Sequence, residues 1–180
     1  MSVLKEIIYR IRGEYTTEKL IKMGLTVGSN FSRNKGVLLD PTHCWLIEIG
    51  NNVTLAPRVH ILCHDASTKL YLGYTKIGRV KIGNNVFVGA SSVIMPGVTI
   101  GNDVIIGANS TVTKDIPDNS VVVGSPGRII GTTSEYIQRE KENMQVLPCY
   151  SEKYTVDGGI SDSMKQQQKD ELKNSKGFVV

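Results

Sequence analysis

The sequence is poor in cysteine and in long apolar runs, and each shortage excludes a class of protein. It has three cysteines in 180 residues, Cys44, Cys63 and Cys149, an odd number whose spacing matches no zinc-binding or CxxC pattern. We therefore expect free thiols in a reducing compartment. No segment reaches the roughly 20 apolar residues that span a bilayer, and the start, MSVLKEIIYRIRG, lacks the features of a secretory signal. These absences predict a cytoplasmic protein without a transmembrane segment.

Charge of one sign is not concentrated anywhere in the chain. The formal net charge is only +4, and no run of Lys and Arg of the kind that follows a phosphate backbone is present. Nucleic acid is therefore a poor partner. A weakly basic surface still favours an anionic small molecule through electrostatic steering.

What the sequence does contain is a repeat of six residues. From Ile82 the hexads run IGNNVF, VGASSV, IMPGVT, IGNDVI, IGANST and VTKDIP, and IGNNVT and LAPRVH precede them. The first residue of each hexad is aliphatic and the fifth is small or β-branched. A fifth residue and the next first residue are two positions apart, so they share one face of a short strand. The third and fourth positions, often Asn or Gly, predict a turn.

One hexad is therefore one strand and one corner, and three hexads close a triangular coil of a parallel β-helix. Strands of an ordinary sandwich are the alternative, but those return about every 8–12 residues. Six consecutive hexads without slippage favour the solenoid.

The two ends do not follow the repeat. Residues 2–12 and 16–23 are predicted to be helical, with Thr16 as the N-cap and Gly24 as the stop of the second helix. Residues 132–145 predict another helix, and the polar stretch that follows is expected to be largely disordered, or helical only against a partner. The predicted divisions are a helical segment (1–24), a repeat domain (25–131), a C-terminal helix (132–150) and a polar tail (151–180).

The hexads, followed by NSVVVGSPGRII, resemble the hexapeptide-repeat acyltransferases, and WLIEIGNNVTLAPRVHILCHDAST is similar to their maltose, galactoside and polysaccharide O-acetyltransferase branch. The resemblance covers roughly residues 25–131 and is most specific over 82–131. It implies an all-β solenoid, a left-handed parallel β-helix, which here would carry short N-terminal and C-terminal helices. It also implies a homotrimer with active sites between subunits and acetyl-CoA as co-substrate.

The repeat breaks off within RVHILCHDASTK. Ile49, Leu55 and Ile61 lead successive hexads, but the next leading residue is Ile82. Asp65 would take an inward position if the hexad continued, and an unpaired carboxylate in the core is costly. The chain is therefore expected to leave the coil in an excursion at about residues 65–80.

His64 is the last residue before this excursion and occupies a corner position that faces outward. Acyl transfer to a hydroxyl needs a base near neutral pH, which is the range in which histidine works. In the family a histidine at the point where a loop leaves the helix has that role, so the resemblance implies that His64 is the general base. The alternative is a surface histidine that caps a corner.

Five further side chains are candidates for contact with the acceptor. His60 points outward near the break, and His43 precedes the first strong hexads; a structural role is the alternative for each. Asp65 could orient the base, but a role in the structure of the loop is favoured. Tyr71 and Tyr74 could stack on a sugar ring or pack against the next subunit.

A metal site is the remaining alternative for the histidines. His60 and His64 have the four-residue spacing of a helical ligand pair. In a β-helix that spacing does not place two side chains on one face. We therefore expect no metal.

The resemblance also implies a binding site for acetyl-CoA along the face between two coils. The Ala90 N–H would face the developing oxyanion, and Phe87 stands beside the acetyl group, where relatives often have Trp. Lys114 and Arg128 would meet the 3′-phosphate. The other positions expected along the coenzyme are Gly89, Gly107, Ala108, Thr113 and Pro126.

These features predict an acetyl-CoA-dependent O-acetyltransferase that acts directly, in a ternary complex, on a hydroxyl of a sugar or polysaccharide precursor. A covalent route through Cys63 is not favoured, because its side chain should leave the strand on the side opposite His64. An amino sugar or an amino-acid hydroxyl remains an alternative acceptor. A non-catalytic trimeric scaffold remains an alternative of another class.

Overall fold

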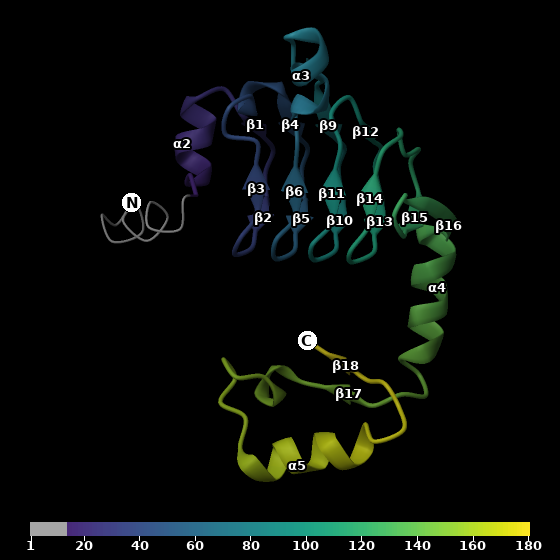
Figure 1. Ribbon diagram of the computed structural model, residues 1–180. Helices are drawn as coiled ribbons and strands as arrows, with labels where there is room; N and C mark the ends of the chain where they lie inside the picture. The colour runs from purple at the N-terminus through teal and green to yellow at the C-terminus, as the bar shows by residue number, and fades with distance from the viewer. Residues whose placement is uncertain (1–13) are drawn as a thin grey trace. The chain divides into compact units, whose positions relative to one another are not determined.

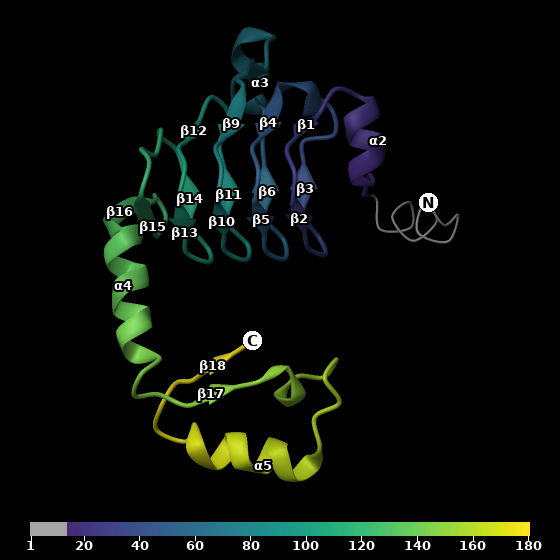
Figure 2. The same cartoon turned by 180° about the vertical axis from the view of Figure 1, so that it is seen from behind.

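The computed structural model describes residues 14–180, so the helix predicted over residues 2–12 lies outside the described residues. The described residues divide into two compact units, 14–133 and 134–180. The first unit is a parallel β-helix, as the hexads predict (Figures 1 and 2). Within residues 14–180, no helix combines the length and the apolar character needed to cross a bilayer.

Three parallel sheets form the sides of the coil. Sheet A has the order β1-β4-β9-β12, sheet B the order β16-β15-β13-β10-β5-β2, in which β16 is antiparallel, and sheet C the order β14-β11-β6-β3. The strands of the coil are β1 (Thr26–Val27), β2 (Ser32–Arg33), β3 (Leu38–Leu39), β4 (Ile47–Ile49), β5 (Thr54–Leu55), β6 (His60–Ile61), β9 (Val80–Ile82), β10 (Phe87–Val88), β11 (Val93–Ile94), β12 (Thr99–Ile100), β13 (Ile105–Ile106), β14 (Thr111–Val112), β15 (Ser120–Val123) and β16 (Arg128–Thr132).

The register between coils shows where the repeat is interrupted. Phe87 pairs with Ile105, a step of 18 residues, or three hexads. Thr54 pairs with Phe87, a step of 33, and Leu38 pairs with His60, a step of 22. The second coil therefore carries 15 extra residues and the first carries four. Both insertions lie at the corner that joins sheet C to sheet A, here called corner CA (residues 40–46, 62–79, 95–98 and 113–115).

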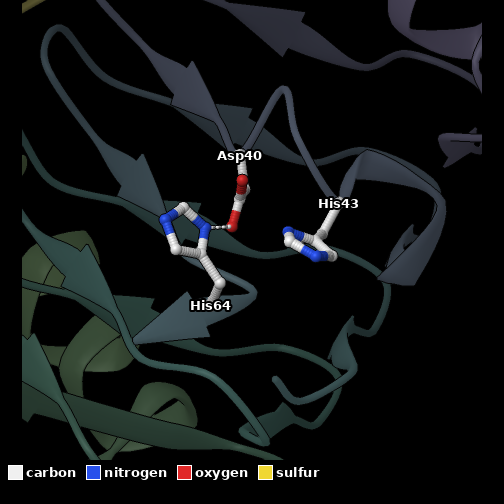
Figure 3. Close-up of side chains that lie close together, drawn as sticks. All are labelled: Asp40, His43 and His64. Atoms are coloured by element: carbon white, nitrogen blue, oxygen red, sulfur yellow. Dashed lines mark hydrogen bonds and ion pairs between the residues drawn. The ribbon is translucent and has the colours of Figure 1, made fainter. Parts of the chain in front are cut away.

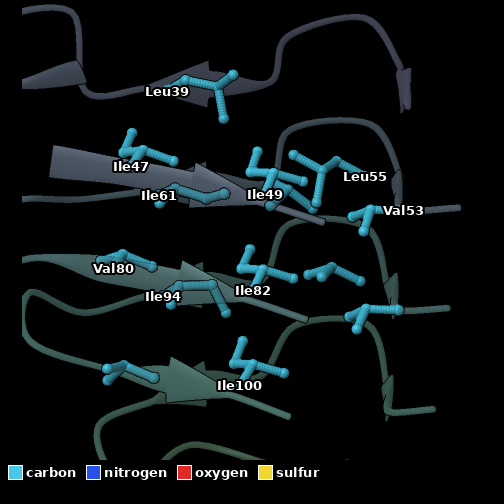
Figure 4. Close-up of a cluster of buried hydrophobic side chains, with 14 of the residues drawn as sticks. Leu39, Ile47, Ile49, Val53, Leu55, Ile61, Val80, Ile82, Ile94 and Ile100 are labelled. Atoms are coloured by element: carbon cyan, nitrogen blue, oxygen red, sulfur yellow. The ribbon is translucent and has the colours of Figure 1, made fainter. Parts of the chain in front are cut away.

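The inward positions of the hexads form the core, as predicted. Val59, Ile61 and Ile94 are fully buried, and Figure 4 shows such side chains stacked in rows inside the coil. The fourth position of the hexad takes the left-handed conformation, with φ of 54° at Asn52 and 55° at Asn85. Asn tolerates this conformation better than most residues, which explains its recurrence in the repeat. Asn85 also accepts a hydrogen bond from Asn52 at 2.9 Å.

A short helix, α2 (Thr17–Lys22), precedes the coil and confirms the helix predicted over residues 16–23. The Thr16 hydroxyl caps it by accepting a hydrogen bond from the Lys19 N–H at 3.2 Å. Gly24 follows with φ of 108°, which a side chain would disfavour. Buried Leu20 joins α2 to the core.

The larger excursion begins where the sequence predicts and has secondary structure of its own. It contains β7 (His64–Asp65), η2 (Ala66–Thr68), α3 (Lys69–Leu72) and β8 (Lys76–Ile77). β7 and β8 pair antiparallel, and α3 projects from the coil near β4 and β9 (Figure 1). The periodicity of the hexads carries no information about this segment, so its hairpin was not predicted.

The second unit departs from the expectation of a largely disordered tail. The predicted helix is present as α4 (Thr133–Asn143), and β17 (Cys149–Tyr150), η3 (Glu152–Tyr154), α5 (Asp162–Glu171) and β18 (Phe178–Val179) follow it. β17 and β18 pair in parallel. The Tyr150 hydroxyl donates to Glu171 at 2.7 Å and the Tyr154 hydroxyl to Gln167 at 2.8 Å. These two tyrosines attach α5 to the preceding segment. The polar composition of this stretch gave no indication of their contacts.

Candidate active site

Two excursions leave the coil at corner CA in consecutive coils. The first follows β3 and contains Asp40, His43 and the short helix η1 (Cys44–Leu46); the second follows β6 and begins with His64. Leu39 pairs with Ile61, so the residues that follow these two strands start side by side. The fold thereby brings together residues that are more than 20 positions apart in the sequence.

His64 and Asp40 form a close pair at this corner. Nδ1 of His64 lies 2.6 Å from Oδ2 of Asp40, and Figure 3 shows the other ring nitrogen on the side away from the carboxylate. The Asp40 side chain is fully buried, whereas that of His64 is 38% exposed. The pair thus has one member fixed in the protein and one that can reach solvent.

Several donors hold the Asp40 carboxylate in place. Oδ2 also accepts a hydrogen bond from the Cys63 N–H at 2.8 Å, and Oδ1 accepts one from the Thr42 hydroxyl at 2.8 Å. Burial alone would raise the pKa of the Asp40 carboxyl. The hydrogen bonds from Thr42, Cys63 and His64 outweigh it and lower the pKa below its ordinary value. Asp40 is therefore an anion at neutral pH.

The anionic acceptor beside Nδ1 determines which ring nitrogen of His64 can accept a proton. With the Nδ1 proton donated to Asp40, the neutral ring carries its lone pair on Nε2. That nitrogen is then a proton acceptor directed away from the carboxylate. The arrangement is suited to general-base catalysis, in which a carboxylate also stabilises the imidazolium that forms.

His43 is the third member of the cluster. Its ring centroid lies 5.4 Å from that of His64 and 5.4 Å from that of Trp45. Its Nδ1 is 3.1 Å from the Thr42 hydroxyl. Of the described residues, Asp40, His43 and His64 bring one potential metal-ligand atom each to within 4.8 Å of one another.

The structure does not place His60 in this cluster. His60 lies on the outer face of sheet C, exposed, in register with Leu38 and Val93. Its spacing to His64 therefore has no significance as a ligand pair, as expected for a β-helix.

Asp65 belongs to the structure of the excursion and not to the orientation of His64. Its carboxylate forms an ion pair with Lys76 at 2.6 Å and accepts a hydrogen bond from the Ser67 N–H at 2.9 Å. The Lys76 contact is the main reason that the pKa of Asp65 lies well below its ordinary value. Tyr71 and Tyr74, further along the excursion, are 82% and 80% exposed.

The buried cysteines are poor nucleophiles. Cys63 precedes His64 but is fully buried in the core, and desolvation raises the pKa of its thiol to about 12. Burial also raises the pKa of Cys44. Neither thiol is suited to a covalent acyl intermediate.

The small residues predicted along the coenzyme lie at a different corner. Gly89 and Ala90 stack on Gly107 and Ala108 at the corner that joins sheet B to sheet C, here called corner BC. It comprises residues 34–37, 56–59, 89–92 and 107–110, together with the β15–β16 connection (124–127), which lies against its last coil. A Cβ on Gly89 would lie 2.4 Å from the Ala108 nitrogen, so this close approach requires glycine. Among residues 14–180, none accepts a hydrogen bond from the Ala90 N–H.

Corner BC continues into the segment that contains Pro126. Thr111 N–H donates to the Gly124 carbonyl at 3.0 Å, and Gly127 N–H donates to the Thr111 carbonyl at 2.8 Å. Pro126 therefore lies one coil beyond Ala108, and Arg128 begins β16 directly after it. A groove of about 720 Å³ opens at the other end of this corner, lined by Glu14, Lys35, Gly36, Pro57, Arg58, Ala90 and Ser91.

The predicted site residues thus form two groups in one chain. Thr113 and Lys114 follow β14 at corner CA, the corner of His64, and both are exposed. Ala90 is at corner BC, at the opposite end of sheet C, and Phe87 lies on sheet B with 45% of its surface exposed. Within a single chain the structure does not bring His64 and Ala90 together.

Asp40 is the residue that sequence reasoning missed. One signal was present, because Asp40 directly follows Leu39, an inward residue of the first coil, and replaces the hexad pattern there. This signal points to Asp40 only once the weak first coil and its four-residue insertion have been recognised.

Comparison with known proteins gives a consistent result. The bacterial transferase hexapeptide (six repeats) model matches residues 79–114. Protein CapG of Staphylococcus aureus is 43% identical over 133 residues, which cover 70% of this chain and 76% of CapG. The structure of a maltose O-acetyltransferase from Clostridium difficile 630 is 46% identical with a TM-score of 0.54, and the match covers 61% of this chain and 59% of that one.

A galactoside acetyltransferase structure in complex with coenzyme A is 29% identical with a TM-score of 0.54, and the match covers 74% of this chain and 80% of that one. The chain thus spans less than two thirds of the maltose enzyme but more than two thirds of the galactoside enzyme. Likeness to these proteins implies that the coil is left-handed. Repeat, fold and sequence identity together show that this chain belongs to the hexapeptide-repeat acyltransferase family.

Proposed function

We propose that this protein transfers an acetyl group from acetyl-CoA to a hydroxyl of a sugar or polysaccharide precursor. The observation that carries the proposal is the pairing of His64 Nδ1 with the buried Asp40 carboxylate at 2.6 Å, which leaves Nε2 as a base. The names of the relatives support the same reaction, since they include a maltose O-acetyltransferase and a galactoside acetyltransferase with bound coenzyme A.

The proposed reaction is a direct transfer in which His64 moves one proton. Nε2 accepts the proton of the acceptor hydroxyl as its oxygen forms a bond to the thioester carbon. The carbonyl oxygen becomes an oxyanion, for which the Ala90 N–H is the proposed donor. As the carbon–sulfur bond breaks, the imidazolium returns its proton to the departing CoA thiolate. Asp40 stabilises the imidazolium between these two steps.

The positions of the two groups favour a site shared between copies of the chain. His64 and Lys114 are at corner CA, whereas Ala90, Ala108 and Pro126 follow one another along corner BC. These groups flank one coenzyme only if corner CA of one copy faces corner BC of another. A homotrimer with three such grooves is the assembly that we propose.

Each wall of the groove has a proposed part in coenzyme binding. The stacked small residues of corner BC leave room for the pantetheine arm. Thr113 borders the groove from the other wall, and Phe87 stands near the acetyl group. Lys114 and Arg128 are the proposed partners of the 3′-phosphate, because cationic side chains form strong charge-assisted hydrogen bonds with phosphate.

The proposal is tested by release of the CoA thiol across a panel of sugars, nucleotide sugars and oligosaccharides. We expect turnover with at least one saccharide and a loss of several orders of magnitude in His64→Ala. Saturating acetyl-CoA should also raise the melting temperature. Turnover that is unchanged in His64→Ala would exclude this residue as the base, and no shift in melting temperature would favour a scaffold without catalytic activity.

A further inference from the structure

The cluster at corner CA has a property that acetyl transfer does not use. Asp40, His43 and His64 come from two excursions, and one nitrogen or oxygen atom of each lies within 4.8 Å of the others. The Thr42 hydroxyl lies among them, 2.8 Å from Asp40 Oδ1 and 3.1 Å from His43 Nδ1. Three potential ligands from two separate excursions therefore converge on one small region.

Two imidazoles and one carboxylate are a donor set that suits borderline divalent metals such as Zn²⁺. Bond lengths of about 2.0 Å in a tetrahedral site separate neighbouring ligand atoms by roughly 3.3 Å. Asp40 Oδ2 and His64 Nδ1 are 2.6 Å apart, so they would have to part by only about 0.7 Å. The pair needs a small adjustment to accept an ion.

The surroundings of the carboxylate support this use. Hydrogen bonds from the Thr42 hydroxyl and the Cys63 N–H fix the orientation of the Asp40 carboxylate. Such outer contacts orient metal ligands in many sites. His64 is 38% exposed and His43 is partly exposed, so an ion can enter from solvent and water can complete its coordination.

We propose that Asp40, His43 and His64 form an inhibitory site for a divalent transition-metal ion of the Zn²⁺ class. The ion replaces the proton between Nδ1 of His64 and the carboxylate. The ring stays neutral when its one proton moves from Nδ1 to Nε2, so Nε2 has no lone pair left to accept a proton from an acceptor hydroxyl. Binding of the ion does not depend on the proposed acetyl transfer; only the inhibition rests on that function.

Binding is measured directly on the full chain, without a histidine tag. Cys149→Ser is the background, because Cys149 is an exposed thiol that would itself bind zinc. Zn²⁺ affinity comes from competition with a fluorescent chelator, and Co²⁺ absorption reports the ligand geometry. We expect saturable binding of one ion per chain, weakened at least tenfold in His43→Gln. His60→Gln, which changes an exposed histidine outside the cluster, is the matched control and should bind within twofold of the background.

Equal affinity in His43→Gln, or no saturable binding at micromolar Zn²⁺, would overturn the proposal. Inhibition is then followed in the acetyl-transfer assay, where the midpoint should equal the dissociation constant and EDTA should restore the rate. The two proposals fail separately. Zinc binding in a protein without acetyl transfer leaves the metal site standing, and active protein that binds no zinc removes the metal site alone.

Discussion

Replacement of Asp40 by Asn tests the proposed role of this carboxylate with little change in shape. The amide oxygen can take the place of Oδ2 and still accept from the Cys63 N–H and from Nδ1 of His64. The amide nitrogen then faces Thr42, whose hydroxyl can turn to accept it, and only the longer hydrogen bond from the Thr42 N–H, at 3.3 Å, is lost. The fold should therefore survive, while the negative charge beside the imidazole is lost.

The size of the effect follows from the distance between the two groups. In the proposed mechanism His64 becomes an imidazolium next to a carboxylate whose oxygen lies 2.6 Å from Nδ1. Unit charges centred about 4 Å apart interact by about 4 kcal/mol at an effective dielectric constant of about 20. Partial exposure of His64 reduces this to roughly 3 kcal/mol. At 1.36 kcal/mol for each factor of ten, kcat should fall about 10²- to 10³-fold.

The assay is CoA release at saturating acetyl-CoA and acceptor, in a Cys149→Ser background so that the thiol reagent detects CoA alone. Asp65→Asn is the matched control. It makes the same chemical change one residue after His64, in a carboxylate that pairs with Lys76. Its kcat should fall less than tenfold. An Asp40→Asn protein that melts like the wild type and keeps kcat within threefold would refute this reasoning.

Three further predictions concern pH, coenzyme binding and thiol reactivity. Because hydrogen bonds lower the pKa of Asp40, its contribution to the free energy of unfolding is complete above the ordinary value near pH 4 and is lost as the pH falls through the lowered value. The melting temperature of the wild type should therefore fall more steeply below pH 4 than that of Asp40→Asn, and parallel curves would contradict this. Lys114→Ala should raise KM for acetyl-CoA by roughly tenfold but not KM for the 3′-dephospho form; equal effects on both would rule out a phosphate contact. A thiol reagent should modify only Cys149 in the native protein, because Cys44 and Cys63 are buried, and rapid labelling of a second thiol would show that the core is open.

The coil was predictable from sequence because its rule is local. The inward residues, such as Ile61 and Ile94, recur every six positions, and the turn before each strand needs a residue that tolerates a positive φ. The residues of each hexad are therefore enough to predict one strand and one corner. The place where the chain leaves the coil was predictable for the same reason, since the hexad pattern stops at His64.

The partner of His64 was not predictable in the same way. Asp40 reaches it only because two insertions of different length occur at the same corner in consecutive coils. Asp65 is the carboxylate nearest to His64 in the sequence, but the hairpin of the excursion pairs it with Lys76 instead. The regular structure of the last 30 residues was also not predicted, since it depends on particular contacts such as that between Tyr150 and Glu171.

The most direct test of the proposed function is a crystal structure of the protein with bound coenzyme A. We predict that the thiol sulfur lies within hydrogen-bonding reach of Nε2 of His64 in one copy, beside the Ala90 N–H of a neighbouring copy. Pro126 and Arg128 should lie near the adenine end of the coenzyme. A coenzyme bound away from His64, or one that contacts only a single copy of the chain, would contradict the account.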